Sequence, residues 1–266
     1  MLFRKTGFWL ALFCVAAFFV VGLTYAWLPI QDPTATHPFD THLPPSSEHW
    51  FGTDKFGRDI FARVLAGSRT VLTIAPLAAV IAVAVGGLIG FFAGYFQGWI
   101  DEVLSRLVDA ILAVPTILIA LAVVVSLTPS SVGVAVIIGL IFAAPVSRTI
   151  RGAVLAEIAL EYVDQAKLRG ERAWYVMFVE ILPNTLPVIL VEFSVRTCFA
   201  IFVAASLSFL GFGVQPPTPD WGLMINEEYQ QLIAGVWWPT LFPALAIAVL
   251  VTAMNFLAEH FSRTFR

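Results

Sequence analysis

The sequence predicts an all-α membrane protein, and two observations carry this prediction. Of its 266 residues 59% are apolar and only 12% are charged, and the mean hydropathy is +0.87. A soluble core of this length does not bury so much apolar surface. The apolar residues also form long continuous runs without the period-two alternation of a transmembrane β-barrel, which favours helices.

Six apolar runs are long enough to cross about 30 Å of hydrocarbon, and each is expected to be one transmembrane helix. They cover residues 8–28, 71–96, 107–127, 132–147, 185–210 and 236–257. The link at residues 128–131 is so short that the third and fourth spans must form a hairpin. Pro115 and Pro145 fall within helical runs and predict bends, because proline removes a backbone hydrogen bond.

The distribution of Lys and Arg predicts that both termini are cytoplasmic. With that orientation, ten of the 15 basic residues lie in cytoplasmic segments and four lie in the first outer loop, as the positive-inside rule requires. The chain then divides into an N-terminal helix with its outer loop, residues 1–70, and a core of five helices, residues 71–266. The core includes a long cytoplasmic connection at residues 148–184.

Several functional classes are excluded by what the sequence lacks. The net charge of −3 and the absence of a Lys/Arg run argue against nucleic acid. No Gly-Lys dipeptide occurs, so there is no phosphate-binding loop, and we expect no enzymatic activity and no ATP hydrolysis by this chain. His37, His42 and His49 are separated by five and seven residues in a Pro-rich loop. We expect them to be solvated rather than to bind a metal.

Charged residues at membrane depth are confined to Glu192 and Arg196 in the fifth span. Because they are four residues apart, they lie on one helix face and are expected to pair. Two interpretations remain open: an intrahelical ion pair that neutralises both charges, or a pair that lines a translocation pathway.

The second span carries a small residue at every fourth position: Ala78, Ala82, Gly86, Gly90 and Gly94. Such a stripe lets a neighbouring helix approach until the two backbones touch. We expect a structural contact here, and a sliding seam is the alternative.

The connection at 148–184 is the only sizeable cytoplasmic surface in this topology, and we expect a partner protein to bind it. Because the chain lacks its own nucleotide site, energy for powered transport has to enter through such a partner. The candidate residues are Glu161, Asp164, Gln165, Ala166, Arg169, Gly170, Leu182 and Pro183.

This connection resembles the EAA loop of ATP-binding-cassette (ABC) importer permeases, which reads E-A-A-x-x-x-G and then I-x-L-P. Asp164 precedes Gly170 by six residues, and Pro183 follows Gly170 by 13, as in that pattern. The chain departs from it at three positions, with Asp164 for Glu, Gln165 for Ala and Glu180 for Ile. An ordinary solvated juxtamembrane helix is the alternative interpretation.

Two further segments resemble the dipeptide/oligopeptide/nickel permeases, specifically the C-type subunit. The first, in the outer loop, is similar to that family's G-T-D-x-x-G-R-D motif through Gly52, Thr53, Asp54, Gly57, Arg58 and Asp59. The second is the run 205–222, with its Pro-rich strap at 216–219. The likeness covers roughly residues 50–257. The outer motif forms either a structured turn or a substrate contact.

The resemblance implies a type I ABC importer permease fold in a bacterial plasma (inner) membrane. It implies a homologous B-type permease as sister subunit, two ATPase domains, separate or fused, and an extracytoplasmic solute-binding protein. ATP and Mg²⁺ would then be held by the partners, with no cofactor on this chain. The cargo implied is a dipeptide or oligopeptide, with nickel, haem or another small solute as alternatives, and the EAA loop would be a short helix seated in an ATPase groove.

Two other classes of protein remain as alternatives. An ion-coupled secondary carrier would work without nucleotide, although the scarcity of intramembrane carboxylates argues against it. A non-transport membrane scaffold would also present a charged loop to cytoplasmic partners.

Overall fold

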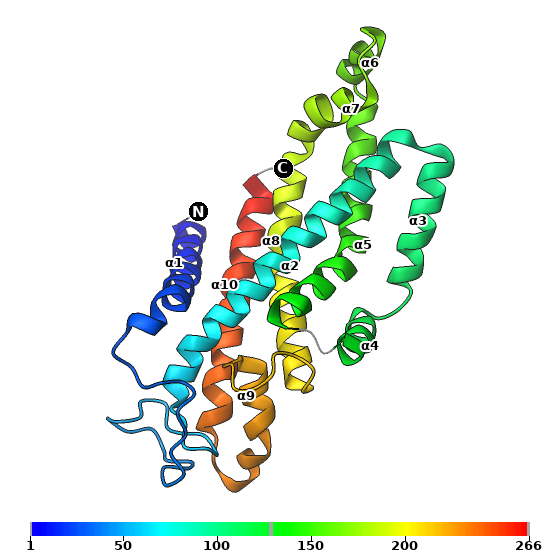
Figure 1. Ribbon diagram of the computed structural model, residues 1–266. Helices are drawn as coiled ribbons and strands as arrows, with labels where there is room; N and C mark the ends of the chain where they lie inside the picture. The colour runs from blue at the N-terminus through cyan, green and yellow to red at the C-terminus, as the bar shows by residue number, and fades with distance from the viewer. Residues whose placement is uncertain (1, 128–129, 265–266) are drawn as a thin grey trace.

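The computed structural model describes residues 2–127 and 130–264 and is helical throughout these ranges, apart from loops and one isolated bridge between Thr53 and Asp59. Thr128 and Pro129, half of the expected hairpin link, lie outside the described residues. Figure 1 shows an elongated bundle in which the long helices run roughly side by side.

The helices occur in the following order. They are α1 (Leu2–Thr24), η1 (Tyr25–Trp27), α2 (Ile60–Phe96), α3 (Gly98–Leu112), α4 (Thr116–Leu127), α5 (Ser131–Ile158), α6 (Glu161–Leu168), α7 (Ala173–Tyr175), η2 (Val176–Ile181), α8 (Leu182–Phe209), α9 (Trp221–Glu228), η3 (Tyr229–Ala234) and α10 (Trp238–Thr264). Within the described residues, five helical segments are long and apolar enough to cross a membrane, or six if the bent pair of α3 and α4 is one span.

The α2–α5 contact is the most extensive helix contact in the bundle, and the stripe of small residues forms it. A Cβ added at Gly86 would overlap the carbonyl oxygen of Ala143, and one at Gly90 would lie 2.6 Å from that of Ser147. The two backbones therefore touch, as the small residues predict. α8 packs against α2, α5 and α10, and α1 lies against α10 and α2.

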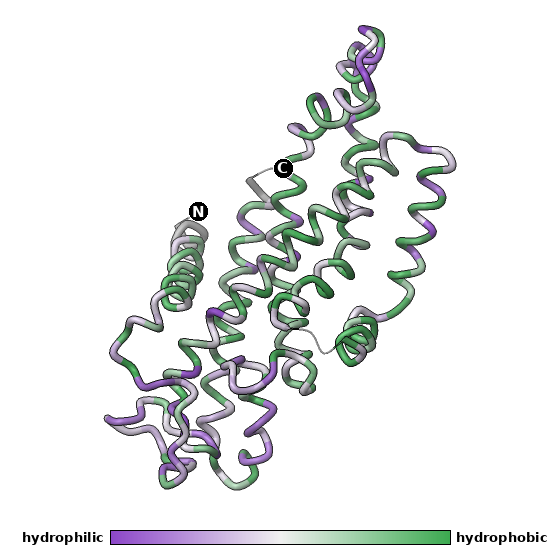
Figure 2. The backbone as a smooth tube through the Cα atoms, in the orientation of Figure 1, coloured by the Kyte–Doolittle hydropathy of each residue, from purple (hydrophilic) through white to green (hydrophobic). Residues whose placement is uncertain are grey.

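The polar segments gather at the two ends of the bundle. In Figure 1, α6 lies at one end, while the loop between α1 and α2 and helix α9 lie at the other. We call these the α6 end and the loop end. In Figure 2 the helices between them are mostly hydrophobic, and the hydrophilic colour concentrates at the tip around α6 and in the outer loops.

The second span is longer than expected. We expected residues 71–96, but α2 begins at Ile60 and has 37 residues. The Asp59 side chain accepts a hydrogen bond from the backbone N–H of Ala62, 2.8 Å away, and this N-cap starts the helix. Arg63 and Arg69 therefore lie on the helix rather than in the loop, and the expected boundary at residues 70 and 71 falls within α2.

The bend predicted at Pro115 is confirmed, but it is sharp enough to replace the single span over 107–127 by two helices. The structure has α3 and α4 instead, and they meet at an angle of 84°. Pro115 has no N–H to continue the hydrogen bonds of α3, while its carbonyl oxygen accepts the first bond of α4, from Leu118 at 2.9 Å. Pro145, by contrast, lies inside α5.

The fifth span also begins earlier than expected. The apolar helical segment runs over Ala173–Phe209, and its α-helical part, α8, begins at Leu182 with Pro183 in the first turn. One turn of π-helix, η2, precedes α8.

Candidate functional site

Helix α6 has a buried face and an exposed face. Val163 and Ala166 are buried in one hydrophobic cluster with Val176, Met177 and Ile181 of η2. The exposed residues of α6 are Glu161, Asp164, Gln165, Lys167 and Leu168. Leu168 is 87% exposed. The helix is thus fixed on one side and presents polar side chains and one leucine on the other.

Gly170 reverses the chain direction after α6. Its φ angle is +81°, and the Glu171 N–H donates to the carbonyl oxygen of Ala166 at 3.2 Å. The Gly170 N–H donates to the carbonyl oxygen of Lys167 at 2.9 Å. This is a Schellman cap, in which glycine adopts the left-handed conformation without steric cost.

Hydrogen bonds fasten α6 to two long helices. The Tyr162 hydroxyl donates to Glu157 of α5 at 2.5 Å and accepts from the Asn184 side chain of α8 at 3.0 Å. Burial, together with the hydrogen bond to Glu157, raises the pKa of Tyr162, so the phenol stays protonated. Tyr162 was not among the residues singled out from the sequence, and its place beside the charged positions was the only available signal.

An ion pair joins the end of α6 to η2. The Arg169 guanidinium lies 3.0 Å from Glu180. Glu180 is one of the three departures from the EAA pattern, and the structure gives it this partner. Leu182 and Pro183 follow directly in the first turn of α8.

The outer motif folds the loop between α1 and α2. A side chain at Gly57 would overlap the backbone of His37, and a Cβ at Gly52 would lie 2.5 Å from the carbonyl oxygen of Leu43. Both glycines have positive φ angles. The Thr53 hydroxyl accepts the Leu43 N–H at 2.8 Å. These residues therefore hold distant parts of the loop together.

The charged residues of the motif join this loop to α9. Arg58 lies 2.6 Å from Asp54 and 2.8 Å from Glu227 of α9, and Arg63 lies 3.6 Å from both carboxylates. We call Asp54, Arg58, Arg63 and Glu227 the outer clamp. All four side chains are buried or nearly so, so each charge depends on the others for its neutralisation.

The prediction that the loop histidines are solvated is wrong for His49. Its side chain is buried and lies 2.9 Å from Asp59. His42 is partly exposed and lies 3.0 Å from Glu228. The loop is held to its neighbours by such pairs: His49 pairs with Asp59 at the start of α2, and His42 with Glu228 of α9. Among the described residues no group of His, Cys, Asp and Glu is arranged to hold a metal ion.

Glu192 and Arg196 lie in α8 between the two ends. Their Oε2 and Nε atoms are 2.8 Å apart. The Arg196 guanidinium also lies 5.9 Å from the Phe142 ring of α5 and 5.7 Å from the Phe199 ring. The α6 residues, the outer clamp and this pair thus occupy three separate levels of the bundle, and the structure does not bring them into one site.

A comparison with protein families now gives these three features a context. Residues 86–266 match the family described as "Binding-protein-dependent transport system inner membrane component". The chain belongs to this family. Its members are permease subunits of ABC importers with the type I fold, and they perform no covalent chemistry. The match includes α6, the Glu192–Arg196 pair and α9.

Individual relatives agree with the family match. The glutathione transport system permease protein GsiD of Pectobacterium atrosepticum is 39% identical over 215 residues, which are 81% of this chain and 71% of that protein. The dipeptide transport system permease protein DppC of Alkalihalophilus pseudofirmus is 35% identical over 248 residues, 93% of this chain and 81% of that protein. DppC of Bacillus subtilis is 33% identical over 248 residues, 93% and 78% of the two chains.

The protein is therefore a multi-pass permease of a bacterial inner membrane and a subunit of an ABC importer. Importers of this family work with a second permease, an ATPase and a binding protein.

Proposed function

We propose that this permease pairs with a homologous B-type permease to form the path for short peptides. We also propose that an ATPase binds α6 and transmits its conformational change to the permease through this helix. The observation that carries the proposal is α6 itself: it projects from the bundle with an exposed polar face, yet it is fastened to α5 and α8. A helix that is exposed outward and held inward transmits a push to the long helices as a rigid body.

The α6 end is proposed to face the cytoplasm. The start of α1 and the end of α10 point toward this end (Figure 1), so both termini would be cytoplasmic, and the charge distribution of the connections agrees. The loop end would then face outward, where an extracytoplasmic solute-binding protein delivers the cargo.

Short peptides are the proposed cargo because the relatives are named for the transport of dipeptides and of glutathione, itself a small peptide. ATP and Mg²⁺ are proposed to bind the two ATPase domains, separate or fused, since this sequence has no phosphate-binding loop. Nickel and haem, which the outer motif also allowed, find no support in these relatives' names.

Motion is proposed to reach the pathway through α8. Asn184 and Glu180 connect α6 to the start of this helix, and Glu192 and Arg196 lie two to four turns farther along it. We propose that this pair lines the path, where Arg196 would meet the carboxylate of a passing peptide.

The coupling role is tested with two glycines that have the same backbone constraint. Gly170 and Gly98 both have positive φ angles, and a Cβ at either would meet no atom within 4 Å. Valine at either position adds about 1–3 kcal/mol of backbone strain. In the assembled importer, Gly170→Val should reduce substrate-stimulated ATP hydrolysis roughly tenfold or more, and Gly98→Val should leave it nearly unchanged.

A charge reversal checks the exposed face without backbone strain. Asp164→Lys should weaken the stimulation, whereas Glu102→Lys on α3, also an exposed carboxylate, should not. Full stimulation in both Gly170→Val and Asp164→Lys, in complexes that contain the ATPase, would contradict the coupling role of α6.

A further inference from the structure

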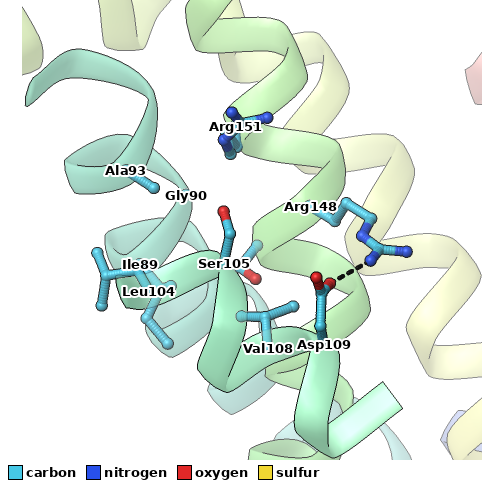
Figure 3. Close-up of a pocket in the computed structure, with 10 residues that line it drawn as sticks. Ile89, Gly90, Ala93, Leu104, Ser105, Val108, Asp109, Arg148 and Arg151 are labelled. Atoms are coloured by element: carbon cyan, nitrogen blue, oxygen red, sulfur yellow. Dashed lines mark hydrogen bonds and ion pairs between the residues drawn. The ribbon is translucent and has the colours of Figure 1, made fainter. Parts of the chain in front are cut away.

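A polar cavity lies between α2, α3 and α5, apart from the three features described above. Its volume is about 260 Å³. Small residues of α2, Gly90 and Ala93, form one wall, and Figure 3 shows Asp109 of α3 joined to Arg148 of α5 at the opening. The cavity is large enough for a phosphorylated headgroup and too polar to stay empty in a membrane.

Two ion pairs of different strength border the cavity. Arg151 holds Asp101 through two bonds of 2.5 and 2.6 Å, and this pair is mostly covered. Arg148 pairs with Asp109, but the two side chains are 62% and 53% exposed. An exposed pair contributes little stability and is readily exchanged for other partners. The cavity thus offers one replaceable cation and one replaceable anion.

The serine hydroxyls leave acceptors available in the cavity. Ser147 donates its proton to the carbonyl oxygen of Ala144 at 2.8 Å, and Ser105 donates to Asp101 at 3.0 Å. Their oxygen lone pairs remain for a donor group. A ligand with an N–H donor close to an anionic group therefore fits better than a simple anion.

The cavity lies where a membrane surface is expected. It flanks the end of α2 and the start of α3, where Trp99 is 75% exposed, and exposed tryptophan is typical of the membrane–water interface. Apolar side chains are exposed beside it: Leu88 and Phe92 on α2, and Val103 and Leu107 on α3. These stripes give acyl chains a surface next to the polar opening.

We propose that this cavity binds the headgroup of a zwitterionic phospholipid with a primary amine, a phosphoethanolamine lipid. The lipid phosphate pairs with Arg148, and the ammonium group pairs with Asp109 and donates hydrogen bonds to the serine oxygens. The exchange replaces one exposed ion pair by two charge-assisted contacts and leaves no charge unpaired. An anionic headgroup would leave Asp109 without a cation. With the orientation proposed above, on which this step rests, the cavity opens to the cytoplasmic leaflet of the membrane.

The test counts bound lipids on the purified importer complex by native mass spectrometry. Phosphatidylethanolamine, phosphatidylcholine and phosphatidylglycerol with identical acyl chains are titrated separately. One molecule of phosphatidylethanolamine should bind about tenfold more tightly than either of the others, because only its ammonium group brings both a positive charge and N–H donors to Asp109. Equal or tighter binding of phosphatidylglycerol would overturn the proposal.

Variants separate the headgroup site from general lipid adhesion. Asp109→Asn should abolish the preference for phosphatidylethanolamine, whereas Arg148→Gln should weaken the binding of all three lipids, because each of them carries the phosphate. Arg106→Gln, which removes an exposed arginine of α3 that pairs with Glu102 outside the cavity, should retain the preference. The double variant Arg148→Asp with Asp109→Arg keeps an α3–α5 ion pair but reverses its direction, so it should assemble normally and still lose the preference. Retention of the preference in Asp109→Asn and in the double variant, with unchanged lipid affinity in Arg148→Gln, would contradict the site.

Two further arms identify other occupants. Inorganic phosphate and soluble phosphoethanolamine should not compete with the lipid at millimolar concentration, because they lack the acyl chains; competition by phosphate alone would overturn the proposal in favour of a free-anion site.

A photoreactive amino acid at Leu104, which lines the cavity, should crosslink to lipid. A crosslink to the sister permease instead would show that a protein helix fills the cavity. Neither result depends on the coupling role of α6, so the two proposals can fail separately.

Discussion

At the scale of single residues, the chain repeatedly buries a charge together with its partner. The outer clamp combines two arginines and two carboxylates with little contact to solvent. Removal of one member of such a group leaves the others uncompensated, which costs more than the group contributes as a whole.

The clamp predicts a large effect of Arg58→Ala. The change leaves Asp54 and Glu227 without their closest cation, and we expect a loss of about 3–5 kcal/mol of local stability. Hydrogen exchange of the outer loop and α9 should rise accordingly. Arg106→Ala, which breaks an exposed pair, should cost at most about 1 kcal/mol. Unchanged protection in Arg58→Ala would show that the clamp is not what holds the loop on α9.

The pair in α8 predicts a separation of assembly from transport. Arg196→Leu alone strands a buried Glu192 and should lower the yield of assembled complex, whereas Glu192→Gln with Arg196→Met removes both charges and should assemble normally. If the pair lines the path, peptide uptake by the double variant should fall roughly tenfold. Ser194→Ala, two residues away, serves as control. Normal uptake by the double variant would leave the pair a purely structural role.

At the scale of elements, the α2–α5 seam depends on where each glycine points. Gly86 faces the backbone of α5, while at Gly87 an added Cβ would meet its nearest atom, in Ile150, at an ordinary 3.5 Å. Two adjacent glycines of one helix therefore have opposite requirements.

This difference predicts opposite effects of the same substitution. Gly86→Ala should force α2 and α5 apart and destabilise the protein by about 1–3 kcal/mol. Gly87→Ala should be neutral or stabilise it by about 0.5–1 kcal/mol, since alanine favours the helix. Thermal unfolding of the purified complex measures both. A similar loss in the two variants would mean that the seam does not distinguish these faces.

At the scale of the whole molecule, the features with proposed roles lie at opposite ends, with a hydrophobic middle between them (Figures 1 and 2). Such a separation suits a subunit that contacts different partners on the two sides of a membrane, and it makes the orientation directly measurable.

Single cysteines at the two ends should label from opposite sides. Leu168 and Phe39 are 87% and 99% exposed, and the native Cys14 and Cys198 lie within helices with at most partial exposure. In cells whose outer membrane is permeabilised and whose inner membrane is intact, a membrane-impermeant maleimide should label Phe39→Cys. It should not label Leu168→Cys until the inner membrane is also permeabilised. The reverse pattern would invert the proposed orientation.

Much of the fold was predictable because membrane spans are a local property of sequence. Each run of about 20 apolar residues predicts a helix by itself, and the connection at 148–184 differs from these runs by its polar composition. The predictions failed at the starts of helices, while the bend at Pro115 was predicted but not its size. Asp59 extends α2 by a side-chain cap, and Pro115 divides a mostly apolar run into two helices at 84°.

The sequence by itself determined the class of protein, the approximate spans, the stripe of small residues and the loop that resembles a coupling segment, because hydrophobicity and short motifs are properties of neighbouring residues. Only the tertiary structure decided which charges of distant segments meet. Arg58 contacts Glu227, which is 169 positions away in the sequence. Arg148 pairs with Asp109 across a cavity. Such partners are chosen by the packing of distant helices, and no local pattern contains that information.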